Sequence, residues 1–156
     1  MRDAAISGRG KFQCYRPGVP LLFTGEAELT IDAKQRLAIP AKYRSQWDPE
    51  KDGKAWICVP VKELGLLRLY PELSFERIAR AQHAGKETLT PTTEQAEAEA
   101  RFFSKAERIE PDSAGRLCLP KQHLDSVGLA GEVVVIGARD RLEVRGREAW
   151  KRISMG

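Results

Sequence analysis

Polar and apolar residues alternate in two short stretches of this chain, and a polar break interrupts each stretch. Around the polar positions 32–35, four apolar residues share one parity: Leu29, Ile31, Leu37 and Ile39. Around positions 112–115, three residues do so: Ile109, Leu117 and Leu119. A period of two with a polar turn between the halves is typical of paired strands that present one apolar face. Each stretch therefore predicts a hairpin.

The same succession of elements follows each stretch. Pro40 and Pro120 end the second strand of each pair, and both suit the first position of a helix, where the missing N–H is not needed. Helices are expected at about 41–47 and 121–127. Four apolar runs predict further strands: 56–59, 67–70, 133–136 and 142–144. The sequence thus predicts an α+β fold of two β-β-α-β-β units, with helices between and after them.

These two units arise from an internal repeat. The pattern D-x-x-x-R-L-x-[IL]-P occurs at residues 32–40 and again at 112–120, a constant offset of 80. Between the copies, residues 72–83 look helical, and Thr92-x-x-Gln95 has the form of a capping box that opens a helix to about Lys105. Four segments are predicted: a flexible basic N-terminal extension (1–21), the first repeat (22–83), a linker (84–92), and the second repeat with its preceding helix (93–152).

The repeated loops carry the candidate functional side chains. Asp32 and Asp112 begin them, and an aspartate in this place accepts hydrogen bonds from backbone N–H groups a few residues on. Arg36 and Arg116 end them, and a planar guanidinium fits a phosphate or the O6/N7 edge of guanine. An Asp–Arg ion pair that only staples the turn is the alternative. Both roles are compatible in one loop.

The two loops differ at two positions. Lys34 adds a positive charge to the first loop, where the second has Ala114. Gly115 stands where the first loop has Gln35. Glycine adopts left-handed backbone conformations freely, whereas other residues lose about 1–2 kcal/mol there. If the two turns match, Gln35 is strained.

Charge and composition narrow the classes of function. Of the formal charge of +4, residues 1–20 contribute four bases and one acid, so the rest of the 156 residues is nearly neutral. Nucleic-acid binding therefore needs bases that are clustered locally. No apolar run approaches the roughly 18–20 residues that span a bilayer, and the N-terminus lacks a secretory core, which predicts a soluble cytoplasmic protein without membrane contact. Three cysteines without a C-x-x-C pair predict reduced thiols and no zinc site.

Catalytic signatures are missing from the sequence. His83 and His123 belong to no metal or nucleophile pattern, and Ser104 lies in no G-x-S-x-G turn. We therefore expect no enzyme, no cofactor, no metal and no small-molecule substrate. Acid–base chemistry by Asp32 and Asp112 is the enzymatic alternative. It is disfavoured because each has an arginine four residues on, which favours an ionised structural carboxylate.

Beyond the repeat itself, several signatures resemble the MraZ family of bacterial transcriptional regulators over about residues 22–152. The matching segments are Phe23-Thr-Gly25, 32–40, Leu69-Tyr-Pro71, Phe103-Ser-Lys-Ala106, 112–116, 137–143 and Trp150. The resemblance implies a tandem of AbrB-like, swapped-hairpin units assembled into a ring-shaped homo-oligomer. It further implies sequence-specific binding of double-stranded DNA at repeated promoter elements upstream of the division and cell wall gene cluster, in the cytoplasm and at the nucleoid.

By this resemblance the loops are the DNA-contacting elements. Lys34, Arg36 and Arg116 match the contacting positions, and the loop-shaping positions are Asp32, Gln35, Asp112 and Gly115. Gln35 replaces the family's glycine and Ala114 its lysine, so unequal contributions are expected. Because one loop makes few contacts, a ring would bind through several loops at once. The alternative is a ring-forming structural or interaction protein without specific DNA contact.

Overall fold

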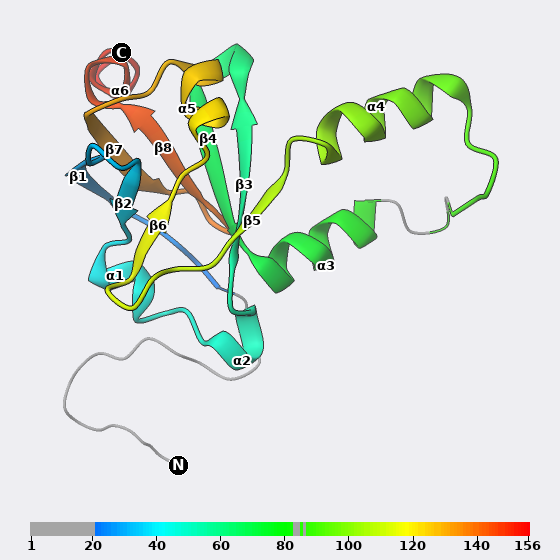
Figure 1. Ribbon diagram of the computed structural model, residues 1–156, viewed down its shortest axis with the longest axis horizontal. Helices are drawn as coiled ribbons and strands as arrows, with labels where there is room; N and C mark the ends of the chain where they lie inside the picture. The colour runs from blue at the N-terminus through cyan, green and yellow to red at the C-terminus, as the bar shows by residue number, and fades with distance from the viewer. Residues whose placement is uncertain (1–20, 83–84, 86) are drawn as a thin grey trace.

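Strands from both repeats form one antiparallel sheet in the computed structural model, which describes residues 21–82, 85 and 87–156 (Figure 1). In sheet order its six strands are β1 (Glu26–Thr30), β7 (Glu132–Gly137), β8 (Leu142–Gly146), β4 (Leu66–Pro71), β3 (Trp56–Val61) and β5 (Glu107–Ile109). Two more strands, β2 (Arg36–Ala38) and β6 (Arg116–Cys118), pair separately as the β2–β6 ribbon. With the helices below, the α+β class is confirmed. The predicted extension lies outside the described residues except for Leu21, as does part of the predicted linker.

The strands that flank each loop do not pair with each other, so the two predicted hairpins are wrong. Strand β1 pairs with β7, β5 with β3, and β2 with β6, each with a partner from the other copy of the repeat. A period of two fixes which face of a strand is apolar, but it does not fix which strand lies beside it. The chain therefore turns at each loop, leaves the main sheet and enters the ribbon.

The helices after the repeated prolines differ between the copies. Helix α1 (Ala41–Arg44) is shorter than expected, and a separate helix α2 (Pro49–Asp52) follows it. The second helix starts afresh because Asp48 caps it, its side chain accepting from the Glu50 N–H at 3.0 Å, with proline at the first position. In the second copy, α5 (Lys121–Val127) matches the prediction and ends at Gly128.

Two helices between the copies project from the body as an arm (Figure 1). They are α3 (Glu72–Gln82) and α4 (Thr93–Phe103). A short 3₁₀ turn, η2 (Lys62–Leu64), lies earlier in the chain, between β3 and β4. The side chain of Thr92 accepts a hydrogen bond from the Gln95 N–H at 3.2 Å, which confirms this half of the predicted capping box. Helix α6 (Arg147–Ser154) follows the second unit.

A single hydrophobic core joins the sheet to the ribbon. Leu37 and Leu117, which pair in the ribbon, are fully buried and belong to the same cluster as Leu69 and Val133 of the main sheet. Burial of each such side chain stabilises the fold by about 1.5–3 kcal/mol. The inner face of the ribbon is thereby anchored, and its outer face is left for other contacts.

The sheet order is symmetric about its central pair, β4 and β8. Pro71 of β4 and Gly146 of β8 pair with equivalent positions of β3 and β7, so they mark the same point in the two copies. Arg68 lies three residues before Pro71, and Glu143 lies three residues before Gly146. Arg68 and Glu143 are thus equivalent positions of the repeat, and they face each other across the central pair. Their side chains form an ion pair, Nε to Oε2, at 3.5 Å.

Candidate nucleic-acid interface

The first loop is organised by the carboxylate of Asp32. Its Oδ1 accepts hydrogen bonds from the backbone N–H groups of Lys34 at 2.8 Å and Arg36 at 2.9 Å. Its Oδ2 accepts from Nε of Arg36 at 2.8 Å. Two backbone bonds close the turn, from the Asp32 N–H to the Arg36 carbonyl and from the Gln35 N–H to the Asp32 carbonyl. The loop is therefore a rigid turn that holds the arginine at its base.

The second loop repeats this geometry almost bond for bond. Oδ1 of Asp112 accepts from the N–H groups of Ala114 and Arg116, both at 2.9 Å, and Oδ2 accepts from Nε of Arg116 at 2.8 Å. The same two backbone bonds close the turn. The bonds expected from the aspartates are thus present in both loops, and so is the stapling ion pair.

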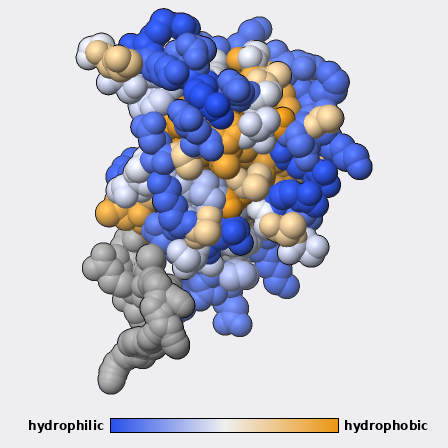
Figure 2. Space-filling model, turned by 90° about the vertical axis from the view of Figure 1, so that its left-hand side faces the viewer, coloured by the Kyte–Doolittle hydropathy of each residue, from blue (hydrophilic) through white to orange (hydrophobic). Residues whose placement is uncertain are grey.

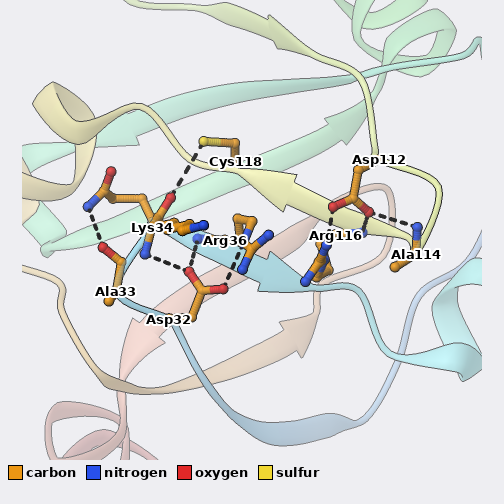
Figure 3. Close-up of polar contacts among 9 residues, drawn as sticks. Asp32, Ala33, Lys34, Arg36, Asp112, Ala114, Arg116 and Cys118 are labelled. Atoms are coloured by element: carbon orange, nitrogen blue, oxygen red, sulfur yellow. Dashed lines mark hydrogen bonds and ion pairs between the residues drawn. The ribbon is translucent and has the colours of Figure 1, made fainter.

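The ribbon brings the two arginines onto one face. In its register, Leu37 pairs with Leu117, Arg36 with Cys118, and Arg116 with Ala38. Since side chains alternate across a strand, the leucines point into the core and both arginines point away from it. Diagonal neighbours in such a pair lie roughly 7–8 Å apart. Figure 3 shows the two arginines side by side over the ribbon, each held by its own aspartate.

Each arginine is held at one atom and open at the others. The aspartate binds Nε, while the terminal amino groups of Arg36 and Arg116 donate no hydrogen bond to any residue in the described part of the chain. Both side chains are about one-third exposed, at 31% and 37%. An ion pair of this kind orients the guanidinium without consuming the edge that can form two parallel hydrogen bonds. The stapling role and a recognition role therefore coexist geometrically.

Both aspartates are set up to stay ionised. The hydrogen bond from the Arg36 backbone N–H lowers the pKa of Asp32, against the opposing effect of partial burial, with further help from the guanidinium and the Lys34 N–H. The Arg116 N–H does the same to the pKa of Asp112. These carboxylates are poor proton donors, as the i+4 arginines suggested.

Backbone geometry confirms that the two turns match at their fourth position. Gln35 has φ of 62° and Gly115 has φ of 77°, so both lie in the left-handed region. Gln35 thus carries the strain that its sequence position predicted. Lys34 lies exposed at the tip of the first loop, and its carbonyl is 3.7 Å from Sγ of Cys118.

One basic residue near the second loop was missed by sequence reasoning. Arg44, on α1, donates from Nε to the Ile39 carbonyl at 2.9 Å, and a Cβ placed on Gly115 would lie 3.0 Å from its Cδ. The side chain therefore lies against the second loop although it belongs to the first copy. The repeat does offer a signal for this residue. At the offset of 80 residues Arg44 aligns with Leu124, which is buried, so an exposed arginine at this position departs from the repeat.

The remaining candidates lie away from the ribbon or form no site. His123 is buried on α5, its Nδ1 3.5 Å from Sγ of Cys58, and burial lowers the pKa of the imidazole. His83 lies outside the described residues. Among the residues that the structure describes, no three metal-ligating side chains gather in one place. In the same residues, every helix is too short or too polar to cross a bilayer.

The side of the molecule that carries β1, β2 and α1 is mostly hydrophilic. Figure 2 shows charged and polar side chains over most of this side, with hydrophobic ones in a recessed band between them. Such a surface suits a polar, hydrated partner better than an apolar one.

Known proteins match this chain over most of its length. The family model described as "MraZ protein, putative antitoxin-like" matches residues 22–96 and 102–155. A transcriptional regulator MraZ of Neisseria meningitidis serogroup C is 34% identical over 134 residues, which cover 83% of each chain. A protein with the same description from Heliobacterium modesticaldum is 34% identical, over 84% of this chain and 85% of its own. Another from Alcanivorax borkumensis is 31% identical, over 83% of this chain and 86% of its own. The chain therefore belongs to the MraZ family.

Proposed function

We propose that this protein is a transcriptional regulator that binds double-stranded DNA sequence-specifically through the outer face of the β2–β6 ribbon. Arg36 and Arg116 are the base-reading candidates, and Lys34 is a phosphate contact at the first loop. The observation that carries the proposal is the shared orientation of the two arginines, each fixed at Nε with its terminal amino groups open. Relatives described as transcriptional regulators support the class of function.

The two-stranded architecture of the ribbon suits the major groove of B-form DNA. That groove admits a two-stranded β-ribbon, and an arginine within it donates two hydrogen bonds to O6 and N7 of guanine. Aspartate ion pairs add to this fit, because a guanidinium that is already oriented loses less side-chain entropy on binding. The nearly neutral charge of the folded part is no obstacle, since the bases needed are concentrated at the loops.

One ribbon offers too few contacts to hold a promoter. Each good bidentate contact supplies only about 1–3 kcal/mol of discrimination, and the ribbon has two candidate arginines. We therefore extend the proposal to a ring-shaped homo-oligomer that places several ribbons on repeated promoter elements. The elements upstream of the division and cell wall gene cluster, at the nucleoid, are the targets that the family resemblance implies.

The arm supplies apolar surface that self-association would cover. Phe102 and Phe103 on α4 are 44% and 41% exposed, and a hollow of about 280 Å³ lies between them and α3, lined by Phe75 and Ile78. This surface also favours the alternative function, an assembly protein without specific DNA contact. Salt separates the two, because phosphate contacts weaken steeply with salt and apolar association does not.

The test is a binding titration with the full chain. Affinity is measured for the duplex upstream of the protein's own gene and for a scrambled duplex, at about 50 and about 200 mM salt. We expect the chain to prefer the upstream duplex, with the preference reduced in Arg36→Ala and Arg116→Ala and retained in Arg152→Ala, an exposed arginine on α6. Melting temperatures check that each variant is folded.

Arg36→Lys sharpens the readout, because it keeps the charge but removes the planar fork. It should retain most of the affinity for scrambled DNA while losing the preference. Equal affinity of the unmodified chain for the two duplexes, with an intact oligomer in solution, would refute the regulator and leave the assembly protein.

A further inference from the structure

The two loops present unequal charge to a ligand. The first contains one acid and two bases, Asp32, Lys34 and Arg36, and has a net charge of +1. The second contains Asp112 and Arg116 and is neutral, because Ala114 stands where the first loop has lysine. Since each aspartate is paired with its own arginine, Lys34 is the cation by which the loops differ.

Pairing between the copies brings another cation to the second loop. Because β2 pairs with β6, the chain leaving β2 runs past the second loop, and the Ile39 N–H donates to the Gly115 carbonyl at 3.2 Å. Helix α1 begins two residues later and carries Arg44 back against the same glycine. Arg44 is exposed, its Nε is held by the Ile39 carbonyl, and its terminal amino groups donate to no residue of the described chain.

The first loop has no counterpart to this residue. The position equivalent to Arg44 in the second copy is Leu124, which is 5% exposed and part of the hydrophobic core. The two differences therefore compensate each other: the loop with its own lysine has a leucine on the neighbouring helix, and the loop without one has an arginine. With Arg44 counted, each loop region carries a net charge of +1.

We propose that Arg44 is the phosphate-contacting cation of the second loop, supplied by the first copy in place of a lysine at position 114. This inference rests on the proposed function and adds a DNA-contacting residue to the same site. Arg44 lies beside the loop and not on the outer face of the ribbon, so it contacts the backbone of DNA that Arg116 reads. Backbone contacts position the protein and strengthen binding to all sequences alike.

The test measures how affinity depends on salt. Loss of one phosphate contact makes the negative slope of log K against log salt shallower by about 0.9. Between about 50 and about 200 mM salt, the affinity of the variant should therefore fall about 3- to 4-fold less than that of the unmodified chain, for each second loop that contacts DNA. Arg44→Gln should show this smaller fall together with weaker binding at low salt, and an unchanged preference for the upstream duplex over the scrambled one. The matched control, Arg152→Gln on α6, should behave like the unmodified chain.

A rescue variant and a conservative variant separate charge from structure. Ala114→Lys added to Arg44→Gln should restore the slope, because it puts a cation back on the same loop. Arg44→Lys keeps the charge and should keep the slope, although it disturbs the bond to the Ile39 carbonyl. If Arg44→Lys lowers the slope as much as Arg44→Gln, the residue has only a structural role and the inference is wrong.

The inference and the proposed function can fail separately. A slope in Arg44→Gln equal to that of Arg152→Gln, with selective binding by the unmodified chain, overturns the role of Arg44 alone. Absence of any preference for the upstream duplex in the unmodified chain overturns the proposed function, and the role of Arg44 with it.

Discussion

Gln35→Gly should leave the fold as stable as before or stabilise it. Gln35 holds φ of 62°, where a side chain crowds the following carbonyl, and the matching turn has Gly115 at φ of 77°. The substitution removes this strain without changing the backbone that Asp32 organises. The substitution also removes one hydrogen bond, from Nε2 of Gln35 to the Ala33 carbonyl, but this bond is exposed and 3.3 Å long, so its loss costs little.

The magnitude follows from two opposing effects. Relief of the left-handed conformation contributes about 1–2 kcal/mol, and the extra backbone entropy that glycine loses on folding costs about 0.5–1 kcal/mol. The net change in the free energy of unfolding is therefore about 0–1.5 kcal/mol in favour of the variant. For a chain of this size each kcal/mol shifts the melting temperature by about 2–4 °C, so a rise of about 0–6 °C is expected.

The reciprocal substitution Gly115→Gln provides the matched control. It introduces the same strain, and its Cβ would lie 3.0 Å from Cδ of Arg44, which has to move. The same net of about 0–1.5 kcal/mol then acts against the variant, and the displacement of Arg44 adds to it, so we expect a fall in melting temperature. Both variants are measured by calorimetry at one protein concentration, because self-association raises the apparent stability. A fall in Gln35→Gly, or no fall in Gly115→Gln, would refute the view that the turns are equivalent.

Three further predictions concern buried charge, acid and thiols. Glu143→Gln should destabilise the fold by about 2–4 kcal/mol in chemical denaturation, because the buried carboxylate pairs with three arginines and its loss leaves two of them, Arg68 and Arg145, without an acidic partner in the described chain, while Arg141 keeps Asp140; an unchanged midpoint would contradict this. Burial raises the pKa of Glu143, but hydrogen bonds from two of these arginines outweigh it and lower the pKa overall. The pKa values of Asp32 and Asp112 are also lowered on folding, so all three groups contribute stability that is present above their unfolded pKa values and is lost as pH falls through the folded ones. Denaturation midpoints should therefore drop below about pH 4, and should drop less in Asp32→Asn. A thiol reagent should label the exposed Cys118 well before Cys58, whose pKa burial raises to about 12, and site-resolved mass spectrometry would expose the opposite order.

Features that depend on residues close together in the chain were predictable from the sequence. Hydrogen bonds from the loop backbone to Asp32 and Asp112, the left-handed conformation at Gln35, and the cap at Thr92 each depend on residues within four positions of one another. Each was expected from the chain alone, and each is present.

Partners from far along the chain were not predictable in the same way. The alternation of polar and apolar residues indicated which face of β1 is apolar. It did not indicate the partner strand, because β7 and the other half of the sheet have equally apolar strands. That choice decides what lies beside each loop. The place of Arg44 was not predictable for this reason, since its side chain reaches the second loop only because β2 and β6 pair.

The unlike pair at the centre of the sheet limits what a half of this chain can do by itself. Two copies of the first half, arranged as the two halves are here, would bring Arg68 against Arg68, and two copies of the second would bring Glu143 against Glu143. The first arrangement is the costlier, because Arg68 has no other acidic partner among the described residues, whereas Glu143 keeps Arg141 and Arg145 of its own half. The two halves therefore form a pseudo-dimer whose central contact is complementary only between unlike halves, and the first half needs the second to neutralise Arg68.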